Sequence, residues 1–443
     1  MKALDSLHFE KFAQKILNEL KSDEELTLNF AGESTLFSRF SKAKIRQVTN
    51  LEQAFIDFNF IKGNKVISFN IPYQASELDF SLALKKLQQS REWISSLPDD
   101  PYLVRPVHYG ITKEESLHVL PQNDEMITQV LDLASHVDLA GVFSSGDLAR
   151  ATINSKGQSH WFKTRNFYLD YSLYNEKQKA VKSLYAGNVF NSQVLKRNIT
   201  DAEFKLNLMN RESKKIARGN YRVFLAPSAV NELVGTLSWG GVSMSAHKQG
   251  NGSLKDLWQQ KKKLSPKFTL EEDFSLGLSP RFNEAGEVAP ARLALIEQGE
   301  FKNFLVSSRT ANEYKLESNF ANEWESMRSP VIHTGDLKRD DILKELQTGL
   351  YISDLHYLNW SDRETARITG MTRYACFWVE NGEIQSPIED LRFDESYYSI
   401  FGECLERITD FSDMSPATGS YFQREVGGSQ MPGVLLSEFK FTL

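Results

Sequence analysis

The apolar residues of the first hundred positions change their spacing twice. They recur at helical spacing in residues 5–21 and again in residues 78–97, which is typical of amphipathic helices. Residues 26–71 are strand-like, with turns expected at Gly32–Ser34 and at Gly63-Asn64. The pattern predicts an antiparallel sheet that is flanked by two helices.

A segment with four prolines, residues 98–121, separates this block from the next one. Residues 123–135 then have a helical pattern, and residues 138–174 predict further strands with turns at Gly146 and Gly157. Residues 175–220 mix polar helical patterns with basic charge. We place the main domain boundary in this last segment.

The second half of the chain has a different character. Residues 222–226 form a short apolar run that predicts a strand, residues 228–237 predict a buried helix, and strand patterns dominate beyond Phe268. The expected fold class is therefore α+β, with an N-terminal domain of helices and antiparallel sheet over residues 1–200. A break near 98–122 would divide that domain in two, and a larger, mainly β domain follows over residues 221–443.

The tract Gly349–Pro387 has the strongest strand signal of the second half. It predicts a strand, a long polar loop over Asn359–Arg373, an aromatic and β-branched strand, a turn at Asn381-Gly382 and a last strand. Loops of that length on a rigid sheet are usually functional or mobile. The loop is therefore a candidate contact region.

Length and charge limit the classes of function. The chain has 443 residues, which is too long for one ordinary core and suggests two or three domains. Its 52 basic and 58 acidic residues give a formal net charge of −6. This balance argues against nucleic acid as the main partner, because nucleic-acid binding relies on a net basic surface.

The two cysteines, Cys376 and Cys404, exclude a framework of disulfides and suit a reducing compartment. The first residues lack an apolar core of signal-peptide length. Residues 225–246 carry too many polar residues and glycines for a membrane span. We expect a soluble, cytoplasmic protein without a membrane partner.

The histidine spacing does not fit a helical zinc site. Such a site places two histidines at i and i+4 on one helix, whereas no two histidines here are closer than ten residues: His8, His108, His118, His136, His160, His247, His333 and His356. An unconventional metal site built from distant histidines and aspartates, such as His356 with Asp354 and Asp362, stays open. Solvated surface residues are the more common explanation of such scattered groups.

Other catalytic motifs are incomplete. Residues Thr236–Gly240 lack the first glycine of G-x-S-x-G, and Ser245–Lys248 fits S-x-x-K without a companion motif. The glycine-rich Gln249–Ser253 lacks the G-K-[ST] ending of a phosphate loop. Cys376 lies in an apolar run and is expected to be a core residue.

Arg39 and Arg46 flank one strand-like segment near the N-terminus. Two long cations near a sheet edge could bind carboxylates of a substrate or a partner. They could also be surface residues whose stems cover apolar neighbours, and the sequence favours this second interpretation.

Several separated blocks resemble the TldD/PmbA family, once called modulators of DNA gyrase and now regarded as metallopeptidase-related. Arg39–Gln47 is similar to the family's R-[FY]-x-x-S/A-x-I-x-Q strand, and Arg222–Pro227 to its V-x-L-x-P strand. Ser279–Gly286 resembles the family's F-D-x-E-G turn, and Gly349–Pro387 its G-L-Y-V-T-x-L-x-G … F-W-I-E-N-G-E-I tract. The order and spacing of the blocks extend the resemblance over nearly the whole chain.

The zinc-binding branch of that family carries H-E-x-x-x-H on the helix after the V-x-L-x-P strand, and a cysteine near the C-terminus. This helix falls near Gly235–Gly240, no histidine lies between His160 and His247, and residues 412–443 contain no cysteine. The chain therefore resembles the TldE/PmbA branch. The loop over Asn359–Gly370 has also lost the family's Gly-Asp pair, which marks a divergent member.

The resemblance implies a subunit of a peptidase that cleaves small or unfolded peptides. Zinc is expected only in a TldD-like partner, and no cofactor is expected in this chain. A stand-alone hydrolase with an unconventional metal site and a non-catalytic, peptide-binding homodimer are the alternatives. The candidate contacts to a peptide or partner are Arg39, Arg46, His247, His356, Asp362, Arg363 and Arg367.

Overall fold

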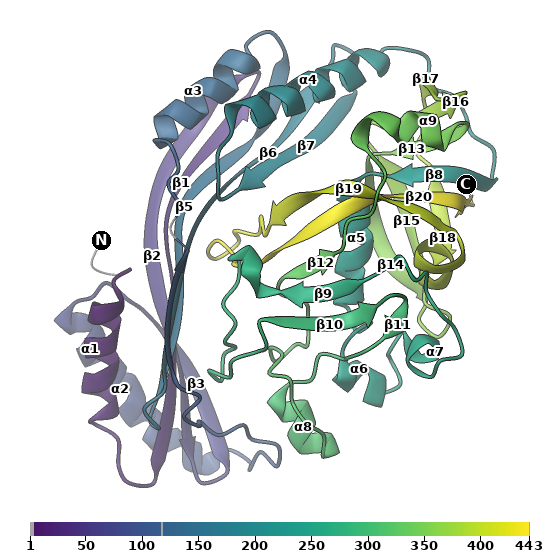
Figure 1. Cartoon of the computed structure of the whole chain (residues 1–443). Coiled ribbons are helices and arrows are strands. Elements are labelled where there is room, and N and C mark those ends of the chain that lie inside the picture. The colour runs from purple at the N-terminus through teal and green to yellow at the C-terminus, as the bar shows by residue number, and fades with distance from the viewer. Residues whose placement is uncertain (1–3, 117, 443) are drawn as a thin grey trace.

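The computed structural model describes residues 4–116 and 118–442. A long, curved sheet of the N-terminal part wraps around one side of a compact C-terminal part (Figure 1). This arrangement agrees with the expected α+β class.

The N-terminal sheet has seven strands in the described residues, in the order β3-β2-β1-β5-β6-β4, and β7 also pairs with β6. All neighbours are antiparallel except β4 and β6. The strands are β1 (Glu24–Ser41), β2 (Lys44–Lys62), β3 (Lys65–Pro72), β4 (Ile111–Ser116), β5 (Asp138–Asn154), β6 (Ser159–Tyr174) and β7 (Ala180–Gly187). The helices are α1 (Ser6–Leu17), α2 (Glu77–Trp93), the 3-10 turn η1 (Ile94–Ser96), α3 (Asn123–Leu133) and α4 (Ser192–Leu208).

Alternation along the strands explains where the helices pack. Leu26, Leu28 and Phe30 of β1 are buried in one core with α1 and α2. Leu36 and Phe40 lie further along the same side of β1 and are buried in a second core with α3 and α4. Because side chains on one face recur every second residue, both helix pairs cover one face and leave the other face to the C-terminal part.

The C-terminal part contains a sheet of 13 strands within the described residues. The strands are β8 (Gly219–Leu225), β9 (Leu270–Asp273), β10 (Arg292–Glu297), β11 (Glu300–Phe301), β12 (Pro330–Ile332), β13 (Gly349–Ile352), β14 (Asp354–Asp362), β15 (Arg367–Arg373), β16 (Phe377–Glu380), β17 (Glu383–Pro387), β18 (Arg392–Ser396), β19 (Leu405–Pro416) and β20 (Gly428–Phe441). The helices are α5 (Pro227–Leu237), α6 (Met244–Lys248), α7 (Lys255–Trp258), α8 (Ser308–Tyr314) and α9 (Ile342–Leu346), with short turns η2 (Phe274–Leu276), η3 (Arg339–Asp341) and η4 (Ser399–Glu403).

A loop from the C-terminal part fastens the two parts together. Arg424, between β19 and β20, is only 1% exposed. Its guanidinium donates to the side-chain oxygen of Asn166 and lies 5.3 Å from the ring centre of Tyr168, both on β6. Its backbone N–H donates to Glu33 on β1 at 3.2 Å. A buried cation with these partners holds the loop against the curved sheet.

Several expected elements are confirmed. The helices expected over 5–21, 78–97 and 123–135 correspond to α1, α2 and α3, and the segments 222–226 and 228–237 to β8 and α5. The turns at Gly63-Asn64, Gly157 and Asn381-Gly382 are also found, and all three glycines have positive φ.

Two expected turns are wrong. Gly32 lies within β1 and Gly146 within β5, and each is paired with strands on both sides. A Cβ on Gly146 would come within 2.0 Å of the carbonyl oxygen of Ser34. Glycine is needed here for the close approach of two strands rather than for a turn.

The long polar loop expected over Asn359–Arg373 is also wrong. Most of it belongs to the antiparallel pair β14–β15, and only Arg363–Ala366 connects the two strands. Polar residues prevail because much of this hairpin is exposed, with alternate residues of β15, such as Ile368, turned into the core. The segment is polar because its strands are exposed, and the sequence pattern alone wrongly indicates a loop.

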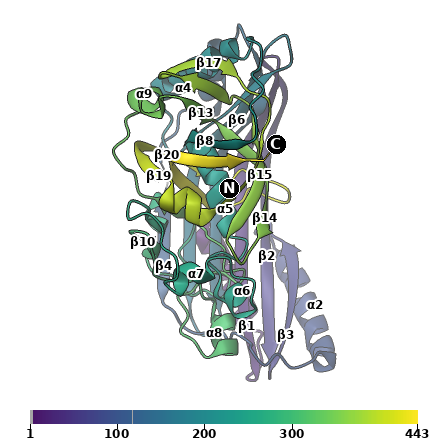
Figure 2. The ribbon, with the colours of Figure 1, turned by 90° about the vertical axis from the view of Figure 1, so that its right-hand side faces the viewer.

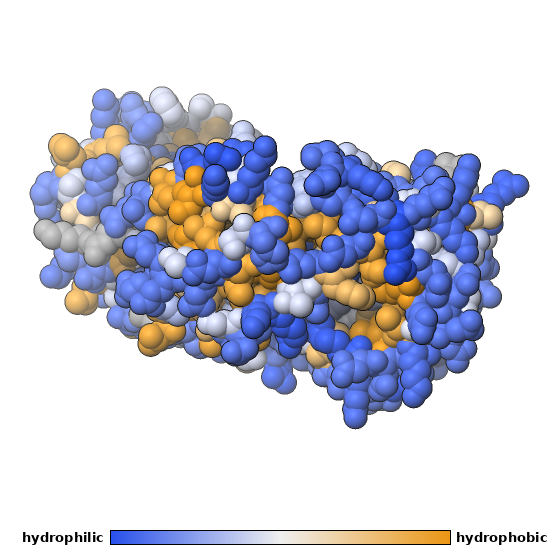
Figure 3. Space-filling model, turned by 90° about the horizontal axis from the view of Figure 1, so that it is seen from above, coloured by the Kyte–Doolittle hydropathy of each residue, from blue (hydrophilic) through white to orange (hydrophobic). Residues whose placement is uncertain are grey.

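The surface seen from above is mostly hydrophilic, and apolar side chains show in patches between polar ones (Figure 3). Among the described residues, no helix is long and apolar enough to cross a membrane.

Candidate functional site

A large cleft of about 840 Å³ lies between the two parts of the molecule. One wall comes from β7 and α4 of the N-terminal part. The opposite wall comes from α5, from the start of β14 and from the end of β19. Cavities of this size, formed where two structural units meet, are the usual location of ligand sites.

The helix α5 presents a small, polar face to the cleft. Pro227 occupies its first turn, where the missing N–H costs nothing. Ala229, Val230, Leu233 and Val234 are buried in the C-terminal core. The remaining face lines the cleft with the following side chains, at helical spacing: Ser228, Asn231, Glu232, Gly235 and, just beyond the helix, Ser238.

Two carboxyl groups lie on this wall. Asp354 at the start of β14 is buried, and it accepts a hydrogen bond from the Ser228 hydroxyl at 2.7 Å. Burial raises its pKa. Glu232, one turn after Ser228, is open to the cleft, and its pKa is raised by partial burial and by the negative charge of Asp354. Such a pair can hold a proton or accept hydrogen bonds from N–H groups.

The facing wall contains a free strand edge. The N–H of Asn175 donates to the carbonyl of Lys179 at 3.1 Å at the closed end of the β6–β7 hairpin, and the register runs unbroken from there. Hydrogen-bond direction alternates along a strand. The backbone groups of Lys182, Leu184 and Ala186 therefore point away from β6, and in the described residues no strand pairs with that edge.

The cleft carries charges of both signs. Its acidic side chains are Asp170, Asp201, Glu232, Asp354, Asp413 and Glu425, and its basic side chains are Lys182, Arg197, Lys205, Arg328 and Arg339. Lys205 on α4 donates to the Tyr351 hydroxyl at 3.1 Å. A wall of mixed sign suits a ligand that has donors and acceptors along its length, rather than a polyanion.

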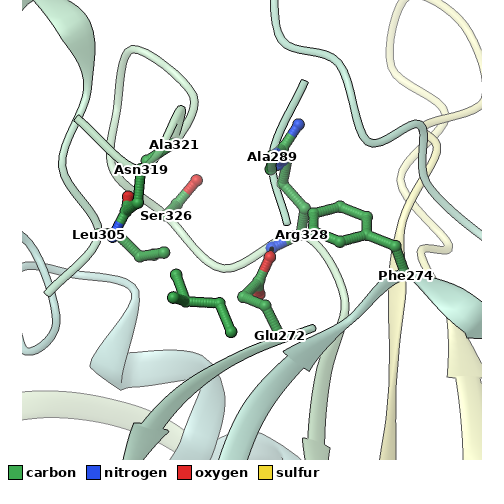
Figure 4. A pocket seen from close by; sticks show the side chains of 9 residues that line it. Glu272, Phe274, Ala289, Leu305, Asn319, Ala321, Ser326 and Arg328 are labelled. Atoms are coloured by element: carbon green, nitrogen blue, oxygen red, sulfur yellow. Dashed lines mark hydrogen bonds between the residues drawn. The ribbon is translucent and has the colours of Figure 1, made fainter. Parts of the chain in front are cut away.

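A small pocket of about 10 Å³ lies next to the cleft wall and is lined by Glu272 of β9 and by Arg328 (Figure 4). The Glu272 carboxylate accepts the backbone N–H groups of Arg328 and Ser329 at 2.9 and 3.2 Å. Burial raises the pKa of Glu272 to about 7. Arg328 also lines the cleft, so this contact fixes a segment of the cleft wall.

None of the seven residues singled out from the sequence lines this cleft. Arg39 and Arg46 are exposed at the far end of β1 and β2, where Arg46 donates to the carbonyl of Ser41 at 3.2 Å. His247 lies between aromatic rings, 4.6 Å from the centre of Trp258 and 4.8 Å from that of Phe304. Burial lowers its pKa.

The other four belong to the β14–β15 hairpin. Arg373 donates to the His356 ring at 3.1 Å, and Asp362 accepts the N–H of Glu364 at 3.0 Å within the connecting turn. Arg363 donates to the carbonyl of Trp239 at 2.7 Å, and Arg367 pairs with Asp394 at 2.8 Å. The structure keeps these residues outside the cleft.

The walls of the cleft were missed for a clear reason. Residues 175–220 were interpreted as a boundary, yet they contain β7 and α4. The helix α5 was expected to be buried on all sides. The helical spacing of the small or polar residues Ser228, Asn231 and Gly235 is the sequence signal that could have identified its cleft-facing side.

Histidines do not gather at a metal site in the described chain. His333 contacts Glu271 at 3.0 Å, His247 lies between Trp258 and Phe304, and His356 contacts Arg373. Within residues 4–116 and 118–442, no three His, Cys, Asp or Glu side chains are placed to hold a metal ion.

Comparisons with known proteins agree with this architecture. The model of the PmbA/TldA metallopeptidase C-terminal domain matches residues 218–443, just over half of the chain. No curated protein matches the sequence.

Three solved structures share the fold over almost the whole chain. TldE from Thermococcus kodakarensis has a TM-score of 0.75 at 14% identity, covering 98% of this chain and 100% of its own. A proposed modulator of DNA gyrase from Thermotoga maritima has a TM-score of 0.74 at 16% identity, with the same coverage of 98% and 100%. Another from Bacteroides thetaiotaomicron has a TM-score of 0.77 at 13% identity, covering 98% of both chains. By its C-terminal domain and by its overall fold, the chain belongs to the TldD/PmbA family of metallopeptidase-related proteins.

Proposed function

We propose that this chain is a TldE/PmbA-like subunit that holds small or unfolded peptides in the cleft between its two parts. In this proposal the zinc chemistry belongs to a TldD-like partner. The observation that carries the proposal is the free edge of β7, whose outward backbone groups face the cleft. An extended peptide binds such an edge through main-chain hydrogen bonds, whatever its sequence.

The charges of the cleft support the same substrate class. An extended peptide presents N–H and C=O groups in alternation, and its side chains carry either sign. Acceptors such as Glu232 and Asp354 and donors such as Lys182 and Lys205 lie on facing walls. This distribution suits a mixed polar chain better than a ligand of one charge.

The cleft does not fit a catalytic zinc ion of this chain. The family resemblance places the zinc-binding histidines near Gly235–Gly240, and Gly235 faces the cleft with nothing within 4 Å of where its Cβ would be. The same face of α5 offers Ser228, Asn231 and Glu232. Catalytic zinc sites use three protein ligands, usually including His or Cys, and this face has neither.

A binding and cleavage experiment tests the proposal. Fluorescein-labelled insulin B chain, reduced and carboxymethylated, is titrated with the purified chain and followed by anisotropy. The same mixture is incubated with and without zinc chloride and analysed by mass spectrometry. We expect saturable binding and no cleavage in either condition. Absence of binding, or zinc-dependent cleavage by the chain alone, would contradict the proposal.

A further inference from the structure

We propose that the free half of the β2 edge, residues 44–53, binds an extended acidic segment of a partner protein by strand addition. This surface is separate from the cleft, because none of its residues lines that cavity. The inference therefore stands or falls independently of peptide binding by β7.

The two edges of β2 differ in their partners. Along one edge β2 pairs with β1 over its whole length. Along the other edge it pairs with β3 only over Phe55–Lys62. Residues 44–53 consequently form an open edge in the described structure, at the margin of the curved sheet (Figure 2). Ten residues of strand span about 33 Å.

The open edge presents main-chain groups in a defined order. The N–H of Tyr73 donates to the carbonyl of Ala54 at 2.8 Å, so the backbone of Ala54 points to the outer edge. The only register shift against β1 in this strand comes before Gln47. By alternation, the N–H and C=O groups of Val48, Asn50 and Glu52 also point outward.

The edge is apolar enough to attract a partner, and it contains no proline. Ile45 and Val48 are 43% and 49% exposed, and no proline or glycine occurs in residues 44–62. Long exposed edges of this kind readily add a further strand. The register shift near Gln47 and the neighbouring charges restrict such pairing.

Cations gather at one end of the edge. Arg39, Lys42, Lys44 and Arg46 all lie within eight positions around the β1–β2 turn, and Glu52 is the one acidic residue of residues 38–54. None of the four forms an ion pair with another described residue. An acidic segment would neutralise them, whereas a segment with the same basic charges would be repelled.

Aromatic side chains mark the opposite end. Gln53 donates from one side-chain nitrogen to Glu33 of β1 at 2.6 Å and to the carbonyl of Phe422 at 2.8 Å, which places the tip of the β19–β20 loop on the sheet face next to this end of the edge. Tyr421 and Phe422 are 91% and 82% exposed. A partner segment would therefore meet cations near Lys44 and an aromatic surface near Gln53. The preferred sequence is acidic at one end and apolar at the other.

Two model peptides test this proposal directly. Fluorescein-labelled nonapeptides with alternating threonine and glutamate, or threonine and lysine, are titrated with the full-length chain and followed by anisotropy. We expect the glutamate peptide to bind and the lysine peptide not to bind. Raising the salt from 50 to 300 mM should weaken binding, because the cations are exposed. No binding of the glutamate peptide, or equal binding of both, would overturn the proposal.

Variants of the edge separate strand addition from simple charge attraction. Asn50→Pro removes an outward N–H without touching the β1 ladder, and Asn50→Ser is its matched control. We expect Asn50→Pro to weaken binding by roughly two- to twelvefold, as the loss of one main-chain hydrogen bond implies. The double variant Lys44→Glu/Arg46→Glu should reverse the preference between the two peptides.

Two further readouts identify other occupants. If a single-stranded DNA 20-mer displaces the glutamate peptide and binds Asn50→Pro as tightly as the wild type, the edge is only a cation patch and the proposal fails. If sedimentation shows a wild-type dimer that dissociates in Asn50→Pro, the occupant is a second copy of this chain, which also contradicts it. A monodisperse variant with unchanged circular dichroism establishes that Asn50→Pro still folds.

Discussion

Replacing Ala186 with proline should weaken peptide binding without unfolding the protein. The backbone N–H of Ala186 points from β7 into the cleft, away from β6. Proline lacks this donor, and it is tolerated on an edge strand where the N–H is not paired. The substitution therefore removes one of the three outward donors that line the cleft, with those of Lys182 and Leu184 left in place.

The size of the effect follows from one hydrogen bond. A neutral main-chain bond contributes about 0.5–1.5 kcal/mol net, so the Kd should rise roughly two- to twelvefold. The assay is anisotropy with the labelled insulin B chain, and Ala186→Ser is the matched control because it keeps the N–H. Equal affinity of the two variants, with both correctly folded, would refute binding along β7.

Other predictions concern stability and reactivity. Gly235→Ala should raise the unfolding free energy by about 0.5–1 kcal/mol, since the new Cβ meets nothing within 4 Å in a helix. Gly141→Ala should lower the unfolding free energy, since its Cβ would come within 2.4 Å of the Asp170 carbonyl. Thermal melts of both variants check these two predictions, and equal melting temperatures would contradict them. The Glu272 pKa is raised to about 7. The contribution of this buried carboxyl group to the free energy of unfolding is therefore complete below pH 4.5 and is lost as the pH rises through 7. Urea unfolding between pH 5 and 8 should therefore show a loss of up to about 3 kcal/mol in the wild type that Glu272→Gln lacks, and parallel pH profiles would contradict this. Burial raises the pKa of Cys376 to about 12, so iodoacetamide at pH 8 should modify the less buried Cys404 first. Peptide mapping that finds equal alkylation rates for the two cysteines in the native protein would contradict this prediction.

The sequence predicted local elements well where a single periodicity dominates. The helix α1 was expected because apolar residues such as Phe12 and Ile16 share one face, and both are buried there. The turn at Asn381-Gly382 was expected from residues that accept positive φ, which both have. Each signal is complete within a short stretch of chain.

The errors arose where distant segments decide the structure. Gly146 was expected in a turn, but the strands on both sides of β5 make it part of a continuous ladder. The polar stretch before Arg373 was expected to be a loop, but pairing between β14 and β15 makes it a hairpin with an exposed face. Both features depend on neighbours that the local pattern does not contain.

Most of the cleft also depends on segments that are distant in sequence. Two of its walls, β7 and α4, lie within the segment that the sequence pattern suggests as a domain boundary, and the free edge of β7 is a property of the assembled sheet. Main-chain donors carry no sequence signature. The family resemblance indicated peptides as the ligand class, and the structure adds a surface that suits them.

Hydrogen exchange of the β7 amides tests the central claim most directly. The chain is exchanged in deuterium oxide with and without saturating insulin B chain, and individual amides are resolved by electron-transfer fragmentation. Binding along the free edge should slow the exchange of Lys182, Leu184 and Ala186, whose N–H groups point outward. Tyr185, already paired with β6, should change little. Protection elsewhere in the chain, with unchanged exchange at these three amides, would contradict the proposed binding of peptides in the cleft.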